Sequence, residues 1–146
     1  MSKRISFDTT LEVRDTCLCL HTQRAARALA RRFDEALRPC GLTNGQFSLL
    51  MSLNRPHAAT MGAVAQVLAM DRTTLTAALK PLQRKGWLTV EPDPSDRRSR
   101  LLTLTETGYA VLAEALPIWR QTHQDIEARL AGTDAAALRA GLMALG

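Results

Sequence analysis

Residues 71–104 read DRTTLTAALKPLQRKGWLTVEPDPSDRRSRLLTL and carry the most informative pattern of helix and strand signals in the sequence. Asp71 is a residue type that caps helices, and three leucines follow at a spacing that places them on one helical face. Beyond this helix come a β-type run over 87–91, a segment rich in turn residues over 92–99 and a second β-type run over 100–104. The stretch therefore predicts a helix followed by a two-stranded hairpin with a charged tip.

A proline inside this helix conflicts with the pattern. Pro81 lacks an amide donor and its ring clashes with the preceding turn, at a cost of about 3 kcal/mol. We therefore expect a kink near residues 77–80 or an early end of the helix. Gly86 is suited to ending the helix in either case, because a glycine after the last apolar position is a common helix stop.

The residues on either side predict further helices. Apolar residues recur at steps of four and seven over 11–38, which predicts one long first helix that ends at Pro39. Thr43 and Gln46 have the spacing of a capping box for a second helix, and a short third helix is expected over 61–69. Downstream we expect a helix capped by Thr105, a bend or interruption at Pro117 and a last helix that begins at Thr133–Asp134.

Three short helices followed by a basic-tipped hairpin form a winged helix-turn-helix. A major groove about 12 Å wide admits one helix, and its base edges display distinguishable donors and acceptors. Arginines at the hairpin tip would lie beside a minor groove, whose negative potential attracts guanidinium groups. The side chains expected at DNA are Arg72, Thr73, Thr74, Thr76 and Lys80 on the last helix and Arg97, Arg98 and Arg100 on the wing.

The charge distribution favours a polyanionic partner. The 146 residues carry a net charge of +5, and residues 72–100 hold seven basic against three acidic side chains. Residues 24–38 hold five against two, whereas residues 101–146 hold three against five. The basic charge therefore lies in the first two-thirds of the chain. The arginines of residues 24–38 also have a plainer explanation, which is solubility of a dimer helix or ion pairs between subunits.

The composition excludes several classes of protein. An apolar content of 46% with 23% charged residues is typical of a globular domain rather than a disordered chain. No apolar run approaches the roughly 18 residues of a membrane span, and the first eight residues lack the apolar core of a signal peptide. Three cysteines without C-x-x-C spacing indicate neither a disulfide framework nor a zinc site, and favour the reducing cytoplasm. We expect no metal, no cofactor and no membrane partner.

Three motifs together resemble the MarR family of transcriptional regulators over nearly the whole chain. The first is Leu42-Thr43-x-x-Gln46-Phe47-x-x-Leu50. The second comprises the run from Met61 through Leu68, Asp71-Arg72-Thr73-Thr74-Leu75 and Leu82-Gln83-Arg84-Lys85-Gly86. The third is Asp93-x-x-Asp96-Arg97-Arg98 with Leu102-x-Leu104-Thr105-x-x-Gly108. Pro81 is unusual for the recognition helix of that family. The resemblance implies a mainly α fold in one unit of residues 1–146, with a winged helix-turn-helix lobe over 42–104 and dimerisation helices over 9–40 and 105–146.

The resemblance also implies a function. A homodimer would bind a palindromic operator in double-stranded DNA, with Arg98 reaching DNA from the wing and Asp96 holding Arg98 in place. We expect a repressor that is released by a small-molecule effector, since MarR-like dimers commonly bind one between the dimer region and the DNA-binding lobe. Aromatic acids or phenols would suit an arginine or histidine anchor. The residues expected to face that crevice are His21, Arg24, Gln46, Leu50 and Trp119.

Cysteine oxidation is an alternative means of control in MarR-like proteins. On a continuous helix Cys17 and Cys19 lie about 200° apart, so each would need Cys40 or a thiol of a second chain as its partner. Cys17 and His21 share a face at i, i+4 and could pair as thiolate and imidazolium. The plainer interpretation is that these cysteines are small apolar side chains. Peroxide-sensing members surround their cysteine with tyrosines, whereas Tyr109 is the only tyrosine here.

Two functions of other classes remain as alternatives. An enzyme could use Cys17 as nucleophile and His21 as base, but no third orienting group and no glycine-rich phosphate loop accompany them. A winged helix could also bind another protein instead of DNA, which the net positive charge of residues 72–100 disfavours. A steep fall of DNA affinity with salt would exclude that alternative, because each neutralised phosphate releases counterions.

Overall fold

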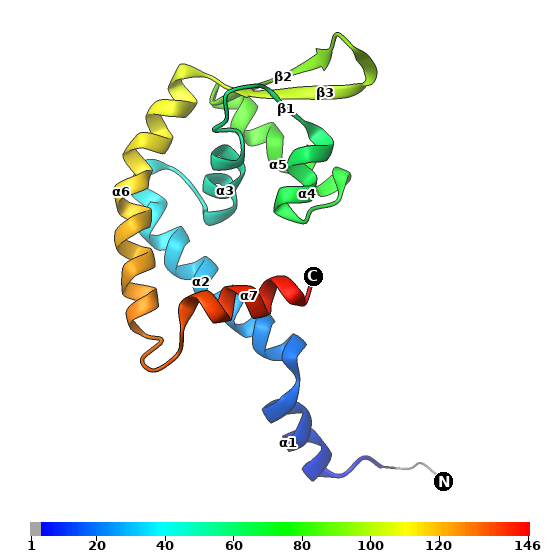
Figure 1. Ribbon diagram of the computed structural model, residues 1–146, viewed down its shortest axis with the longest axis vertical. Helices are drawn as coiled ribbons and strands as arrows, with labels where there is room; N and C mark the ends of the chain where they lie inside the picture. Colours follow the sequence, from blue (N-terminus) through cyan, green and yellow to red (C-terminus); the bar gives the residue numbers. More distant parts are fainter. Residues whose placement is uncertain (1–3) are drawn as a thin grey trace.

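The computed structural model describes residues 4–146 as a mainly helical chain with one small sheet (Figure 1). The predicted fold class, a winged helix-turn-helix with flanking helices, is confirmed. No helix among the described residues has the length and apolar character needed to cross a membrane. The elements in chain order are α1 (Phe7–Thr16), α2 (Leu18–Leu37), the 3-10 helix η1 (Arg38–Cys40), α3 (Asn44–Ser52), β1 (Ala59–Thr60), α4 (Met61–Leu68), α5 (Arg72–Arg84), β2 (Leu88–Asp93), β3 (Asp96–Leu104), α6 (Glu106–Ala128) and α7 (Ala135–Ala144).

Helices α3, α4 and α5 and the sheet enclose the main core. Leu50, Val64, Leu75, Leu82 and Leu102 are at most 1% exposed and belong to one apolar cluster. Full burial of such a side chain stabilises the fold by roughly 1.5–3 kcal/mol, so this cluster fixes how the helices stand against the sheet. The three leucines predicted to share one face of α5 are all buried.

Strands β2 and β3 form the antiparallel wing, with Leu88 opposite Leu104 and Val90 opposite Leu102. Both strands extend further than predicted, because β2 reaches Asp93 and β3 already begins at Asp96. A third strand, β1, was not predicted; it pairs with β3 and gives the sheet the order β1-β3-β2. A strand of two residues has no alternation that a sequence pattern could reveal.

The predicted helix caps are confirmed. The Thr43 hydroxyl accepts from the Gln46 N–H at 3.2 Å, and Gln46 Oε1 accepts from the Thr43 N–H at 3.1 Å, which is the reciprocal capping box. Asp71 caps α5 by accepting from the Thr74 N–H at 2.7 Å. Each cap satisfies amide groups that the start of a helix leaves free.

The single long helix predicted over residues 11–38 is wrong. The chain forms α1 and α2 instead, which meet at Cys17, where the backbone is extended with ψ at 108°. The Cys17 N–H donates to the Val13 carbonyl at 3.0 Å, and Cys17 Sγ accepts from the Leu20 N–H at 3.4 Å. One residue therefore ends α1 and caps α2. Cysteine is not among the usual capping residues, so no stop signal was readable at this position.

The two helical prolines do not break their helices, while the predicted kink before Pro81 and the predicted bend at Pro117 stay predictions. Pro81 does not end α5, which continues to Arg84, and Pro117 does not interrupt α6. Each proline removes the hydrogen bond to the carbonyl four residues earlier, at Ala77 and at Ala113. Both alanines are exposed, so water can bond the freed carbonyls and lower the cost of the proline.

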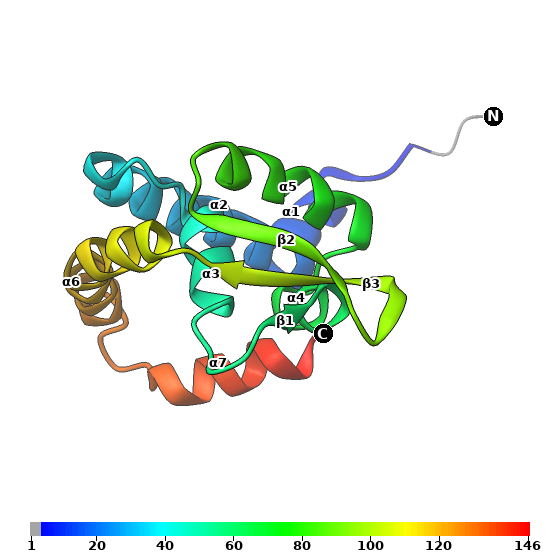
Figure 2. The same ribbon diagram turned by 90° about the horizontal axis from the view of Figure 1, so that it is seen from above.

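The remaining helices form an arm beside the lobe. Helices α2 and α6 run next to each other, whereas α7 passes in front of α2 and α1 projects away from the lobe in the view of Figure 1, and Figure 2 shows α7 set apart from α2. Apart from Val67 and Tyr109, every strongly exposed large apolar side chain within residues 4–146 lies on or beside α1, α2 or α7. Of the apolar stripe predicted along residues 11–37, only Leu37 is fully buried in the single chain.

Candidate nucleic-acid interface

The exposed face of α5 carries polar side chains opposite its buried leucines. Arg72, Thr73, Thr76 and Lys80 are exposed and line, together with Ala77, a shallow hollow of about 340 Å³. Their spacing along the helix places them on one surface. Four of the five helical residues predicted to contact DNA are therefore brought together.

The hydroxyl groups on α5 have different roles. The amide and hydroxyl of Thr74 donate to the Asp71 carboxylate at 2.7 and 2.9 Å, so Thr74 serves the cap and does not line the hollow. These bonds hold the pKa of Asp71 below its ordinary value of 3.8, and the bond from the Thr74 amide contributes most. The Thr76 hydroxyl donates to the Arg72 carbonyl at 2.8 Å, which leaves its oxygen lone pairs free to accept from a base edge.

The turn between α4 and α5 fixes where the polar face stands. Ala69 adopts a left-handed conformation with φ at 51°, and the Met70 N–H donates to the Ala65 carbonyl at 2.9 Å. A non-glycine residue in that conformation costs about 1–2 kcal/mol, which the packing of the two helices must offset. Sequence reasoning missed Ala69, because alanine is not a residue type associated with left-handed turns.

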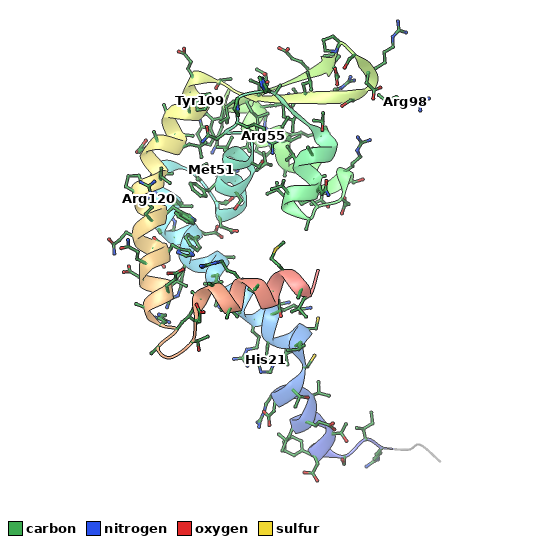
Figure 3. The ribbon with its side chains drawn as sticks, viewed as in Figure 1. His21, Met51, Arg55, Arg98, Tyr109 and Arg120 are labelled. Atoms are coloured by element: carbon green, nitrogen blue, oxygen red, sulfur yellow. The ribbon has the colours of Figure 1, made fainter. Side chains whose placement is uncertain are left out.

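The wing tip is held in shape by its own acidic side chains. Asp93 Oδ1 accepts from the Ser95 N–H at 2.9 Å and from the Ser95 hydroxyl at 2.7 Å, and these bonds lower the pKa of Asp93 below 3.8. Asp96 Oδ1 accepts from the backbone N–H of Arg98 at 2.9 Å. Asp96 thus holds the backbone of Arg98, while the Arg98 side chain lies at the wing tip and extends away from the lobe (Figure 3).

Among residues 4–146, no carboxylate forms an ion pair with a basic side chain of this lobe. The ion pairs found within residues 4–146 join Arg14 to Asp15 and join Glu127 to His123 and Arg139, all outside α5 and the wing. The three wing arginines are exposed, as is Lys80 on α5. Exposed, unpaired cations beside a hydroxyl-bearing helix face are the arrangement that binds phosphates and base edges.

Helix α6 is fastened to the base of the wing. The Thr105 hydroxyl donates to the Gly86 carbonyl at 2.6 Å and accepts from the Gly108 N–H at 3.0 Å. The Thr105 N–H donates to the Trp87 carbonyl at 3.1 Å. A Cβ at Gly108 would overlap the Trp87 carbonyl oxygen and would lie 3.2 Å from Leu104 Cδ2, so the close approach of α6 requires a glycine.

The five residues predicted to line an effector crevice do not line one hollow in the single chain. His21 borders an apolar cleft of about 510 Å³ between α2 and α7, whereas Arg24 lies in a separate basic hollow on α2. Gln46 is engaged in the cap of α3, and Leu50 is fully buried. Trp119 stacks on a core phenylalanine with ring centroids 6.1 Å apart. Their part in effector binding stays a prediction.

A different hollow lies where the lobe meets the arm. It has a volume of about 220 Å³ and opens between α3 and the first half of α6, the two helices on which Figure 3 labels Met51 and Tyr109. Sequence reasoning missed it, because the spacing of Tyr109, Leu112 and Leu116 is that of an apolar helix face, whereas Tyr109 is 45% exposed. The hollow is lined by Met51, Asn54, Tyr109, Leu112, Ala113 and Leu116.

The cysteines differ from their predicted geometry. Because Cys17 lies between α1 and α2, Cys17 and Cys19 do not lie on one continuous helix, and the separation of about 200° predicted for such a helix does not apply. His21 Nδ1 lies 2.7 Å from the carbonyl oxygen of Cys17, so the imidazole bonds the backbone rather than the thiol. Cys40 is buried, and burial raises the pKa of its thiol, with a further contribution from Glu114. Redox control stays a prediction.

Known proteins share both the sequence motifs and this architecture. The sequence profile of the MarR family matches residues 42–99, which run from just before α3 into β3. The multiple antibiotic resistance protein MarR of Escherichia coli strain K12 is 32% identical over 109 residues, which make up 74% of this chain and 76% of that protein.

Two structures solved with DNA are also similar. The transcriptional regulator MosR of Mycobacterium tuberculosis, in complex with DNA, matches with a TM-score of 0.80 and 37% identity over 89% of this chain and 93% of that chain. The transcriptional repressor CouR, bound to a 23-mer DNA duplex, matches with a TM-score of 0.71 and 28% identity over 98% of this chain and 96% of that chain. Such relatives are transcription regulators and not enzymes. With its polar recognition face and its basic wing, the chain belongs to the MarR family of DNA-binding transcriptional regulators.

Proposed function

We propose that this protein is a homodimeric repressor that binds a palindromic operator and is released by a small aromatic effector. The observation that carries the proposal is that α5 and the wing tip present exposed basic side chains which, among the described residues, pair with no carboxylate. The repressor CouR, solved on a DNA duplex, supports the direction of regulation. A DNA target implies that the protein works in the cytoplasm, where the chromosome lies.

On DNA, α5 enters the major groove and the wing lies against the adjacent minor groove. Thr73 and Thr76 contact base edges, and Arg72 grips a guanine or a phosphate at the start of the helix. Lys80, at the far end of the hollow, binds a phosphate. The wing arginines neutralise the backbone and the narrow minor groove, so they supply affinity more than base preference. Two lobes related by a twofold axis contact half-sites about 10 bp apart.

A second copy of the chain covers the apolar surface of the arm. Leu18, Leu138 and Leu142 border the cleft between α2 and α7 and are 66%, 41% and 47% exposed. Soluble monomers rarely leave contiguous apolar surface of this kind open to water. Burying a fully exposed leucine contributes roughly 1.5–3 kcal/mol, so covering the remaining exposed part of each side chain would contribute about half of that, which favours association through residues 9–40 and 105–146.

The hollow between α3 and α6 suits a single aromatic ring. Met51, Leu112 and Leu116 give it apolar walls, and Asn54 and Tyr109 supply polar groups that could orient a carboxylate or phenol. Helix α3 belongs to the lobe and α6 to the arm. A ligand wedged between them would alter the angle of the lobe and hence the spacing of the two α5 helices. Such a ligand releases DNA only if it binds the altered angle more tightly.

Selection of duplexes from a random-sequence library tests the proposal. The protein should enrich a palindrome, bind it with two protomers per duplex, and lower expression of a reporter when the selected site overlaps the promoter. Benzoate and hydroxybenzoates serve as effector probes. The effect of a probe is measured as the DNA affinity without the probe divided by the DNA affinity with it. Ala113→Trp fills the hollow and should bring this ratio toward one, whereas Ala113→Ser should leave the ratio as it is in wild type. Enrichment of no duplex, or one protomer per duplex, would contradict the proposal.

A further inference from the structure

We infer that Lys85 is a positioning residue that couples the arm helix α2 to the recognition helix α5 and sets how α5 stands in the groove without itself touching DNA. The inference rests on the proposed function, because it takes α5 as the DNA-reading helix and α2 as part of the dimer. Lys85 is exposed, so its role cannot be that of a core side chain.

Lys85 joins the ends of two helical segments. It is the C-cap residue of α5, and its N–H donates to the Pro81 carbonyl at 3.1 Å, which closes the last turn. Its Nζ reaches across the fold and donates to the Gly41 carbonyl at 3.0 Å. Gly41 is the left-handed C-cap of η1, which continues α2. The end of a helix carries partial negative charge, so an ammonium group is favoured there.

The ammonium group is also held by an aromatic ring. Lys85 Nζ lies 4.4 Å from the centroid of the Trp87 ring, within the range of a cation–π contact. Trp87 is itself half-buried against the core, and its N–H donates to the Leu82 carbonyl at 3.1 Å. The Trp87 ring and the Gly41 carbonyl together restrict the Lys85 side chain, which would otherwise move freely. Because the side chain is restricted, a movement of α2 can be passed on through Lys85 to the end of α5.

Among residues 4–146, the bond from Lys85 Nζ to the Gly41 carbonyl is the one hydrogen bond that joins two parts of the fold. One part consists of α2, η1 and the cap residue Gly41, and the other consists of α5 and the wing. The same short segment, residues 85–87, is fastened on its other side to α6, through the bonds of Thr105 to the carbonyls of Gly86 and Trp87. This segment is also the connection between α5 and β2. A shift of α2 relative to α6 would therefore move the end of the recognition helix and the base of the wing together.

A direct contact of Lys85 with a DNA phosphate is the competing explanation, and Lys80 provides the matched control. Both residues are exposed lysines of the α5 region, but only Lys80 lines the recognition hollow. Lys85→Met keeps the length of the side chain and removes its charge and donor. Lys85→Arg keeps the charge, the donor and the contact with the ring. Lys80→Met removes the charge from the recognition face.

The full-length variants are compared with wild type on the duplex that wild type selects from the random library, and on duplexes whose half-sites are moved apart by one base pair. Fluorescence anisotropy across a range of salt gives both the affinity and its log–log salt slope. We expect Lys85→Met to weaken binding on the order of tenfold, which is typical of coupling between sites, with the salt slope unchanged. It should also lose discrimination between the two spacings, and Lys85→Arg should restore both properties. Lys80→Met should reduce the slope by about 1.8 in a dimer and keep the discrimination.

Three results would overturn the inference. A slope reduced by about 1.8 in Lys85→Met would show a phosphate contact by each protomer. Unchanged affinity would show that Lys85 has no role. Equal loss on both spacings, with a lowered melting temperature and no rescue by arginine, would show a stabilising role only. If wild type selects no duplex at all, the proposed function fails and the inference fails with it. If wild type selects a duplex but Lys85→Met gives one of the three results above, the inference alone fails.

Discussion

Replacing Gly108 with alanine should destabilise the protein, although alanine is the better helix former. Gly108 lies in the first turn of α6, where a Cβ would overlap the Trp87 carbonyl oxygen and lie 3.0 Å from the carbonyl carbon. These are backbone atoms, and the Thr105 N–H already bonds the same carbonyl at 3.1 Å. They cannot rotate away as the end of a flexible side chain could, so α6 or the base of the wing must move.

The magnitude follows from opposing effects. Alanine in place of glycine gains up to about 1 kcal/mol of helix propensity. Forcing a methyl group into a packed contact costs about 1–3 kcal/mol, and loss of the hydrogen bond from Thr105 to Trp87 costs about 0.5–1.5 kcal/mol more. These ranges combine to a net loss of about 0.5–4.5 kcal/mol, and we expect Gly108→Ala to lower the free energy of unfolding by an amount inside it, about 1–3 kcal/mol. For a chain of this length, that loss corresponds to a melting temperature lower by about 3–10 °C.

Urea denaturation followed by circular dichroism measures the change, at one protein concentration because the stability of a dimer depends on it. Gly62→Ala is the matched control. Gly62 also lies in the first turn of a helix, α4, but a Cβ there meets nothing within 4 Å. The control should be neutral or stabilising by up to about 1 kcal/mol. A Gly108→Ala variant as stable as wild type, or more stable, would show that α6 and the base of the wing accommodate the methyl group without cost.

Three further predictions concern DNA, the dimer and pH. Arg98→Ala should weaken binding to all operator sequences alike and reduce the log–log salt slope by about 1.8 in a dimer, as measured by anisotropy; an unchanged slope would contradict a phosphate contact. Leu142→Asp should raise the dimer dissociation constant in sedimentation, because a carboxylate would be buried unpaired in the cleft between α2 and α7; an unchanged constant would mean that the interface lies elsewhere. Asp71→Asn should flatten the loss of stability in acid. Because the pKa of Asp71 is lowered in the folded state, its ionised form stabilises α5 above pH 3.8, and that stabilisation is lost as the pH falls through the lowered value. Melting temperatures on both sides of pH 3.8 measure the effect, and parallel curves for the variant and wild type would rule it out.

Features encoded by neighbouring residues could be predicted from the sequence. The caps at Thr43 and Asp71 act within three residues, and the leucines of α5 fall at helical spacing, so both were readable. The break at Cys17 was not, because it depends on a thiol in the place of a usual cap. Strand β1 was not readable either, because its pairing to Leu102 spans a long stretch of chain.

The site could be predicted only where its residues adjoin in the chain. The polar face of α5 and the wing arginines each come from one short run, and the structure keeps both runs on one lobe. The contacts of Lys85 with Gly41 and of Gly108 with Trp87 join distant segments, and no periodicity specifies such pairs. The residues assigned to one effector crevice separated for the same reason, since their surroundings depend on how α2, α3 and α6 pack.

The most direct test of the central claim is a base-resolution footprint of the wild-type protein on the duplex that it selects. We expect two protected segments related by the symmetry of the palindrome and centred about 10 bp apart. Within each segment, α5 should protect major-groove base edges, and the wing should protect the minor groove alongside. One protected segment without symmetry, or no protection at any salt concentration, would contradict the claim that two copies of this chain read DNA through α5 and the wing.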